Sequence, residues 1–337
     1  MRITKAVALV VVVAGGLNVA SAQVRINAAG ATFPYPIYSQ WFHEFQQQKG
    51  VQINYQSIGS GGGISALTAG TVDFGASDRP MTDAEIAKMK YKPLHFPTVL
   101  GAVVPTYNIS GVSKDLQFTG EVLAGIFSGN IKKWNDNAIK SINPGVNLPN
   151  ADIVTVHRSD GSGTSFVFTD FLSKTSPEWK SKIGANQSPN WPGGLAAKGN
   201  EGVAGSVSQT PNSIGYVELI YALQNKMAFG TVKNASGKFV KGSLAGVTAA
   251  ADAMVSKIPA DFRVSITDAP GAAAYPISTF TYLLIPSTIP DTAKKTAIVE
   301  FLHWMLTTGQ GTAEKLNYSR LPQSLIPREE QQIAQIK

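Results

Sequence analysis

Hydrophobic and polar positions along the chain alternate between a helical period and a strand period. Residues 51–58 alternate and are rich in β-forming residues, which predicts a strand. One helix is predicted from four aromatic residues at positions i, i+3, i+4 and i+7, namely Tyr38, Trp41, Phe42 and Phe45. Four more strands are predicted at 99–107, 153–156, 214–217 and 280–285. This alternation of strands with amphipathic helices indicates an α/β architecture.

Capping residues and loop residues mark where elements begin and end. The pair Thr82 and Glu85 forms a capping-box pattern, which predicts a helix that continues to about Met89. Gly and Pro gather at 142–150 and 184–202, and both stretches are predicted to be surface loops. Near the C-terminus, a helix is predicted to begin after Asp291, to end at Gly309, and to bury Ile298, Phe301, Leu302 and Met305.

Length and the N-terminal segment set the broad class of protein. A chain of 337 residues predicts two domains. Arg2 and Lys5 precede a short apolar run at 6–14 and an A-x-A site at 20–22, so residues 1–22 are predicted to be a signal peptide. The alternative is a retained membrane anchor, although the run is too short to span a bilayer. We therefore expect export to the periplasm, with further secretion left open. Since the chain has no Cys, it has no lipid-attachment cysteine and no disulfide.

Charge is moderately basic and dispersed. Without Arg2 and Lys5, 27 Lys and Arg remain against 22 Asp and Glu, a net charge of +5. The lysines are scattered and do not form a block interleaved with aromatic residues, so nucleic acid is not expected as a partner. A surface that attracts small anions is the milder interpretation.

Three segments combine glycine, small residues and hydroxyls at predicted helix starts: 30–34, 59–63 and 158–165. A helix start exposes N–H donors and the positive end of the helix dipole, and glycine lets an anion approach closely. Ser and Thr hydroxyls add donors that carry no charge. Each turn taken singly is also ordinary turn chemistry. Three of them together with Arg158 predict an oxyanion held by many neutral donors.

Enzymatic and metal chemistry have weaker sequence support. The glycine run at 59–63 is no Walker A loop, although Gly61-x-Gly63-x-x-Ala66 fits a loose dinucleotide fingerprint. The four His residues are widely separated and show no metal-ligand spacing. An exported phosphatase that uses Ser162 or Thr164 is kept as an alternative, but the surrounding sequence is not a nucleophile elbow. We expect no catalytic residue, no metal and no cofactor.

Six ordered motifs carry a resemblance to a known family: 29–34, 58–63, 72–78, 127–136, 158–165 and 213–218. They resemble the periplasmic phosphate-binding protein of the bacterial phosphate-specific ABC transporter, and the similarity runs from about Asn27 to about Gln323. The resemblance implies a two-lobed α/β binding-protein fold of type II, with a mixed sheet flanked by helices in each lobe. Lobe I would comprise 23–104 and 279–337, lobe II would comprise 105–278, and the hinge would lie near 103–106 and 275–279.

The resemblance also implies where phosphate binds and which partners the chain has. Phosphate would lie between the lobes and favour their closure, and the partners would be permease subunits of an ABC importer, with the chain acting as a monomer. The sequence gives no ground for excluding arsenate as a second ligand. Asp160 would hold Arg158 in place, and the phosphate-binding residues would be Ala31, Thr32, Phe33, Ser60, Asp78, Arg158, Ser162, Gly163 and Thr164.

Asp78 has a role that charge attraction alone would not predict. A residue of this kind is usually a solvated or capping side chain, and Arg158 with Asp160 could equally form a surface ion pair. Beside an anion, however, an ionised carboxylate only accepts hydrogen bonds, so it favours a ligand that carries a proton. Phosphate carries one at neutral pH and sulfate does not. Asp78 therefore counts against the alternative ligands sulfate, molybdate and tungstate. An adhesion role has no support from repeats or aromatic patches.

Overall fold

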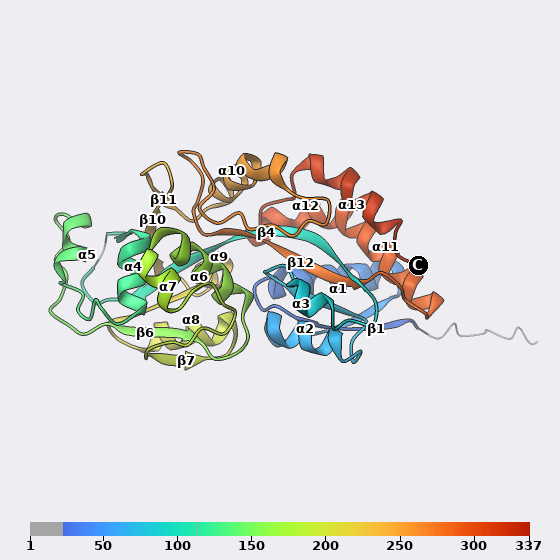
Figure 1. The fold of residues 1–337 in the computed structure, drawn as a ribbon, viewed down its shortest axis with the longest axis horizontal. Helices are drawn as coiled ribbons and strands as arrows, with labels where there is room; N and C mark the ends of the chain where they lie inside the picture. Colours follow the sequence, from blue (N-terminus) through green and yellow to red (C-terminus); the bar gives the residue numbers. More distant parts are fainter. Residues whose placement is uncertain (1–22, 113) are drawn as a thin grey trace, which may run out of the picture.

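The computed structural model describes residues 23–112 and 114–337. The predicted signal peptide at 1–22 lies outside the described residues. Figure 1 shows two lobes side by side, joined by the long strand β4, which runs through both. None of the helices in the described part of the chain combines the length and the hydropathy needed to cross a membrane.

Nine strands form one continuous mixed sheet, in the order β2-β1-β3-β12-β4-β8-β6-β7 with β9 paired to β4. The strands of the first lobe are β1 Arg25–Gly30, β2 Gln52–Ser57, β3 Phe74–Ser77 and β12 Ser278–Pro286. The strands of the second lobe are β6 Val154–Arg158, β7 Leu195–Ala197, β8 Ser213–Glu218 and β9 Ala228–Phe229. A separate three-stranded sheet consists of β5 Gln117–Phe118, β10 Thr231–Lys233 and β11 Phe239–Lys241.

Helices cover both halves of the long sheet. Those of the first lobe are α1 Tyr35–Lys49, α2 Ser60–Thr68, α3 Asp83–Ile86, α11 Thr292–Trp304, α12 Gln310–Ala313 and α13 Ile326–Ile333. Those of the second lobe are α4 Gly120–Phe127, α5 Asn137–Ile142, α6 Gly163–Thr175, α7 Pro177–Lys182, α8 Gly199–Gln209 and α9 Leu219–Gln224. Helix α10 (Leu244–Met254) packs against β4 and β12. Three short 3₁₀ segments lie at Val255–Lys257, Glu314–Leu316 and Gln323–Leu325. The predicted two-lobed architecture, with a mixed sheet in each lobe, is confirmed.

Strand β4 (Pro93–Asn108) is the element that both lobes share. Its residues 93–102 pair with β12, and its residues 103–108 pair with β8. The change of partner occurs between Ala102 and Val103, next to the first segment predicted as a hinge. The two predicted hinge segments touch, because the Val103 N–H donates to the Ile277 carbonyl at 2.9 Å. Whether the lobes move about this point remains a prediction.

The start of β4 was missed by the prediction of a strand at 99–107. Pro93 and Pro97 break the pattern that predicts a strand, because proline donates no ladder hydrogen bond. The fold accommodates Pro97 at an irregularity of the β4–β12 pairing, where the register shifts between Thr281 and Tyr282. Proline is tolerated at such a bulge, so the strand begins at Pro93.

The two predicted helix starts hold, and the two predicted helix ends do not. The capping box at Thr82 and Glu85 is present, although α3 ends at Ile86. The helix that begins after Asp291 does not end at Gly309 but continues through a π-turn at Met305–Gly309 into α12. Gly309 has helical backbone angles, and its carbonyl accepts a hydrogen bond from Trp41 Nε1 at 2.9 Å. The glycine therefore allows close packing against Trp41 and does not end the helix.

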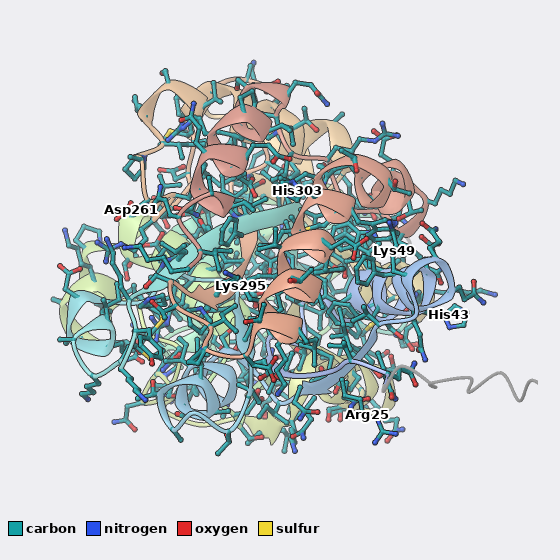
Figure 2. The ribbon with its side chains drawn as sticks, turned by 90° about the vertical axis from the view of Figure 1, so that its right-hand side faces the viewer. Arg25, His43, Lys49, Asp261, Lys295 and His303 are labelled. Carbon is teal, nitrogen blue, oxygen red and sulfur yellow. The ribbon has the colours of Figure 1, made fainter. Side chains whose placement is uncertain are left out.

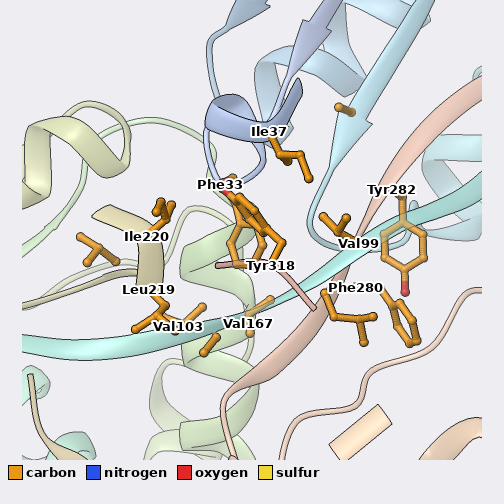
Figure 3. Close-up of a cluster of buried hydrophobic side chains, with 14 of the residues drawn as sticks. Phe33, Ile37, Val99, Val103, Val167, Leu219, Ile220, Phe280, Tyr282 and Tyr318 are labelled. Carbon is orange, nitrogen blue, oxygen red and sulfur yellow. The ribbon is translucent and has the colours of Figure 1, made fainter. Parts of the chain in front are cut away.

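A buried apolar cluster lies where the lobes meet. Figure 3 shows Phe33 from the first lobe beside Leu219 and Ile220 from the second, above β4. The Phe33 ring packs against Tyr318, with ring centroids 6.2 Å apart, and both side chains are fully buried. This contact lies within the first lobe, and the same loop is tied to the second lobe by Tyr221, whose hydroxyl donates to the Thr32 carbonyl.

The segment 184–202 is only partly the surface loop that was predicted. It contains β7, and its last residues form the first turn of α8, where Asn200 is fully buried. By contrast, the predicted loop 142–150 contains no helix or strand after Ile142, which is the last residue of α5. Charged residues are dispersed as expected, and Figure 2 shows Arg25, Lys49 and Lys295 well separated at one end of the molecule.

Candidate functional site

Four helix starts converge at the junction of the lobes: those of α1 and α2 from the first lobe, and those of α6 and α8 from the second. Helices α1 and α2 have no side chain bonded to their first N–H groups. The first two N–H groups of α8 donate to the side chains of Asp160 and Thr32. Helix α6 is capped by Ser162, whose Oγ accepts from the Ser165 N–H at 3.0 Å. Since helix starts carry free N–H donors and positive dipole ends, this junction suits an anion.

The loop before α1 brings three of the predicted residues to this junction. Thr32 is 2% exposed, and no hydrogen bond among the described residues uses the N–H of Thr32 or of Phe33. The backbone of Ala31 is occupied instead, because its N–H donates to the Ala76 carbonyl at 3.1 Å and its carbonyl accepts from Tyr55. Ala31 therefore anchors the loop, while Thr32 and Phe33 keep donors available.

Ser60 begins α2, and its hydroxyl joins the two lobes. Its Oγ accepts from the Asp78 N–H at 3.2 Å and from the Gly163 N–H at 3.0 Å. A hydroxyl oxygen has two lone pairs, and both are occupied by N–H groups. The Ser60 hydroxyl can consequently make a further hydrogen bond only as a donor.

Asp78 follows β3 and is buried, so it is neither a solvated nor a capping residue. Its Oδ1 accepts from the Thr281 hydroxyl at 2.9 Å, and its backbone carbonyl accepts from the Thr279 hydroxyl. Burial raises the pKa of Asp78 to about 7, even though the Thr281 hydrogen bond and the Arg158 charge act in the opposite direction. Near neutral pH this carboxyl group is therefore ready to share a proton.

Arg158 ends β6 and forms a buried pair with Asp160, not an exposed ion pair. The Arg158 side chain is 1% exposed and that of Asp160 is 12% exposed. Arg158 Nε donates to Asp160 Oδ1 at 2.8 Å, and Nη2 donates to Oδ2. Burial would raise the pKa of Asp160, but the hydrogen bonds and the charge of Arg158 outweigh burial and lower it. The two hydrogen bonds from Arg158 to Asp160 fix the orientation of the guanidinium.

Two glycines let the lobes approach each other. A Cβ at Gly163 would lie 2.4 Å from Ser60 Oγ and 2.6 Å from Asp78 Oδ2. A Cβ at Gly59 would lie 2.2 Å from Asp160 Oδ2. Any side chain at either position would therefore force the two halves apart. The same geometry shows that Oδ2 of Asp78 faces the start of α6.

Sequence reasoning missed Asn200, a polar residue of this junction that is hydrogen-bonded to both lobes. It is fully buried, and its Nδ2 donates to Thr32 Oγ1 at 2.8 Å and to Thr164 Oγ1 at 3.1 Å. Asn200 lies in the segment 184–202, whose Gly and Pro content predicted a loop outside the site. That interpretation is wrong, because this segment also supplies the Gly199 N–H that donates to Asp160 at 3.1 Å.

Other contacts between the lobes flank the site and were also missed. Arg79, 4% exposed, donates from Nε to Gln187 Oε1 at 3.1 Å across the junction. Tyr221 of α9 donates to the Thr32 carbonyl at 2.6 Å. The only sequence signal for these contacts was the position of Arg79 beside Asp78, because their partners are distant along the chain. The lobes are in contact, so the molecule is in a closed arrangement.

The alternative of a serine nucleophile lacks a partner in this geometry. Ser162 Oγ serves as the N-cap of α6, and the His157 ring contacts the Arg158 carbonyl through Nδ1 at 3.1 Å. Within residues 23–112 and 114–337, no group of three or more His, Asp or Glu side chains is arranged to hold a metal ion. What the candidate site offers is a set of neutral donors, the Arg158 guanidinium and the Asp78 carboxyl acceptor.

Comparison with known proteins agrees with this geometry. The model of the PBP superfamily domain matches residues 18–308. The phosphate-binding protein PstS of Xylella fastidiosa is 47% identical over 304 residues, which cover 90% of this chain and 83% of the relative. The PstS protein of Pasteurella multocida is 43% identical, with 90% and 88% covered.

Solved structures show the same fold at lower identity. A high-affinity periplasmic phosphate-binding protein (PfluDING) bound with phosphate superposes with a TM-score of 0.70 and 21% identity, over 91% of this chain and 93% of the other. The phosphate-binding protein of Stenotrophomonas maltophilia has a TM-score of 0.70 and 19% identity, over 92% and 93%. The chain therefore belongs to the PBP superfamily and, within it, to the family of the phosphate-binding proteins PstS.

Proposed function

We propose that this chain captures inorganic phosphate between its two lobes and delivers it to an ABC-type importer, without chemistry on the ligand. The observation that carries the proposal is the pairing of a buried carboxyl acceptor, Asp78, with Arg158 and converging helix starts. A site made only of donors would accept any oxyanion. A site with one acceptor among donors suits an oxyanion that brings a proton.

The proposed roles follow from the contacts of each residue. Arg158, held by Asp160, supplies the single positive charge, and its hydrogen bonds to an anion would be charge-assisted. The hydroxyls of Thr32, Ser60 and Thr164 and the N–H groups at the starts of α1, α2 and α6 supply neutral donors. Ser162 and Gly163 lie at the first turn of α6, which orients its dipole toward the ligand.

Asp78 is proposed to select phosphate over sulfate. Monohydrogen phosphate donates its proton to the carboxylate, whereas sulfate would present a second acceptor to it in a buried site. Two acceptors facing each other without a proton cost about 1–3 kcal/mol or more. Arsenate carries a proton in the same way, so we expect it to bind as well.

The remaining assignments complete the proposal. Lobe I consists of 23–104 and 279–337, lobe II consists of 105–278, and phosphate favours their closed arrangement about the β4 junction. After removal of 1–22, the chain acts as a periplasmic monomer and docks on permease subunits. These assignments are supported by the exchange of β4 partners and by the PstS relatives.

Isothermal titration of the phosphate-stripped protein tests the proposal. We expect one equivalent of phosphate to bind, arsenate to bind as well, and sulfate to bind far more weakly at about pH 9, where Asp78 is ionised, and equal ionic strength. Equal affinities for sulfate and phosphate would overturn the proposal. Turnover of a chromogenic phosphomonoester, abolished by Ser162→Ala, would instead support the phosphatase alternative.

A further inference from the structure

The side-chain amide of Asn200 connects the two lobes at the candidate site. Its Nδ2 donates to Thr32 Oγ1 of the first lobe at 2.8 Å and to Thr164 Oγ1 of the second at 3.1 Å. Its backbone N–H donates to the same Thr32 oxygen at 3.2 Å. All three residues are 2% exposed or less, so water does not compete for these hydrogen bonds.

The orientation of the Asn200 amide is fixed by a backbone group. Its Oδ1 accepts from the Glu218 N–H at 2.9 Å. A backbone N–H can only donate, so the amide atom that faces it must be the oxygen. The NH₂ group consequently faces Thr32 and Thr164. Glu218 ends β8 and pairs with Val103, where β4 changes partners, so this orientation is set at the junction of the lobes.

The fixed amide determines the direction of two hydroxyl groups. Thr32 Oγ1 accepts both donors of Asn200. Thr164 Oγ1 accepts from Asn200 Nδ2 and from Arg158 Nη1, the latter at 3.4 Å. Each hydroxyl oxygen has two lone pairs, and in both residues these are occupied. Each hydroxyl proton must therefore be donated to a further acceptor.

We propose that Asn200 is a positioning residue that converts the Thr32 and Thr164 hydroxyls into obligatory donors toward the bound anion. This inference rests on the proposed function. Without Asn200, each hydroxyl could rotate and present a lone pair, and a lone pair repels an oxyanion. The Asn200–Thr32 hydrogen bonds join the two lobes, so they form only on closure. Asn200 should accordingly slow the release of phosphate more than it speeds its capture.

A double-mutant cycle between Asn200 and Thr32 tests this mechanism. We expect Asn200→Ala to weaken the binding of inorganic phosphate by about 10- to 100-fold, because it frees two hydroxyls. Thr32→Val removes one of these two hydroxyl groups. If Asn200 acts through Thr32, Asn200→Ala should have a clearly smaller effect in the Thr32→Val background than in the wild type. Stopped-flow measurement should show the loss mainly in the dissociation rate.

Asn234→Ala provides a matched control. Asn234 is also buried, and its Nδ2 donates to the carbonyls of Gly271, Ala272 and Ala274, outside the site. This variant should lower Tm and leave phosphate affinity unchanged. If Asn200→Ala does not fold, Asn200→Ser serves in the same cycle, because one hydroxyl can donate to only one of the two threonines.

The outcomes separate this inference from the proposed function. Failure of the wild-type protein to bind phosphate would remove the proposed function itself. If the wild type binds phosphate, an unchanged affinity in the Asn200 variant would overturn the inference. Strict additivity of Asn200→Ala and Thr32→Val would overturn it as well, because a purely structural role would produce that result.

Discussion

Two carboxyl groups flank the same junction, one from each lobe, and their pKa values move in opposite directions. Asp78 is surrounded by hydroxyl and N–H groups, and burial raises its pKa to about 7. Asp160 is also partly buried, but two hydrogen bonds from Arg158 lower its pKa. A direct cationic partner therefore decides whether a buried carboxylate stays ionised.

The difference assigns different tasks to the two lobes. The second lobe presents a permanent ion pair, and its guanidinium attracts anions of any kind. The first lobe presents an acceptor whose charge depends on a proton. Under the proposed function, the second lobe therefore attracts anions, and the first lobe distinguishes anions by whether they carry a proton.

Removing the cation should have the largest effect. Arg158→Ala deletes the guanidinium that pairs with Asp160 and leaves that carboxylate buried without its cationic partner. We expect phosphate binding to weaken by about 3 kcal/mol or more, measured by titration calorimetry. Arg320→Ala, at an exposed ion pair with Glu314, is the control and should have no effect. An unchanged dissociation constant for Arg158→Ala would remove this residue from the site.

Neutralising each carboxyl group in turn sharpens the comparison. Asp78→Asn should narrow the preference for phosphate over sulfate by about 1–3 kcal/mol, because the amide can donate to sulfate. Asp160→Asn should weaken the binding of both anions without narrowing that preference, since it only loosens Arg158. If the Asp78→Asn variant prefers phosphate over sulfate as strongly as the wild type in competition calorimetry, Asp78 does not select between the two anions.

Sulfate binding should depend on pH through Asp78. Sulfate can accept a hydrogen bond from Asp78 only when the carboxyl is protonated. The protonated fraction of Asp78 falls as the pH rises above about 7. We expect sulfate affinity to fall about tenfold per pH unit, or about 1.4 kcal/mol, above that pH and to level off below it. Asp78→Asn should abolish this dependence. A parallel pH profile in the variant would show that another group controls it.

The smallest effect should be on the stability of the ligand-free protein. The pKa of Asp78 is about 7 in the folded chain and about 4 in the unfolded chain, so the folded state holds the proton more tightly. The stability that this group contributes is present below pH 4 and is lost as the pH rises toward 7. Asp78→Asn should therefore have a higher free energy of unfolding than the wild type at pH 8 and show no such gain at pH 4, measured by denaturant unfolding at both pH values.

The local signals of the site could be predicted from the sequence. Ser60 and Gly163 stand in Gly- and Ser-rich turns that precede apolar helical periods, and such turns form helix starts through short-range interactions. Arg158 and Asp160 are two residues apart, so their pairing needs no distant element. The role proposed for Asp78 came from the family resemblance and from the fact that an ionised carboxylate can only accept hydrogen bonds.

Other features depended on residues far apart in the chain. Pro93 and Pro97 concealed the first half of β4, because only its pairing with β12 provides the irregularity that accommodates a proline. Gly309 resembled a helix end because glycine favours that position, yet contact with Trp41 keeps it helical.

Asn200 illustrates the limit of sequence reasoning most clearly. Its neighbours in sequence are glycine-rich and predict a loop, while its hydrogen-bond partners lie at Thr32, Thr164 and Glu218. The sequence by itself determined which donors and acceptors exist and which helices start near them. Only the tertiary structure decided how they are oriented and how far each carboxyl is removed from water, because burial and hydrogen-bond direction arise from packing between distant segments.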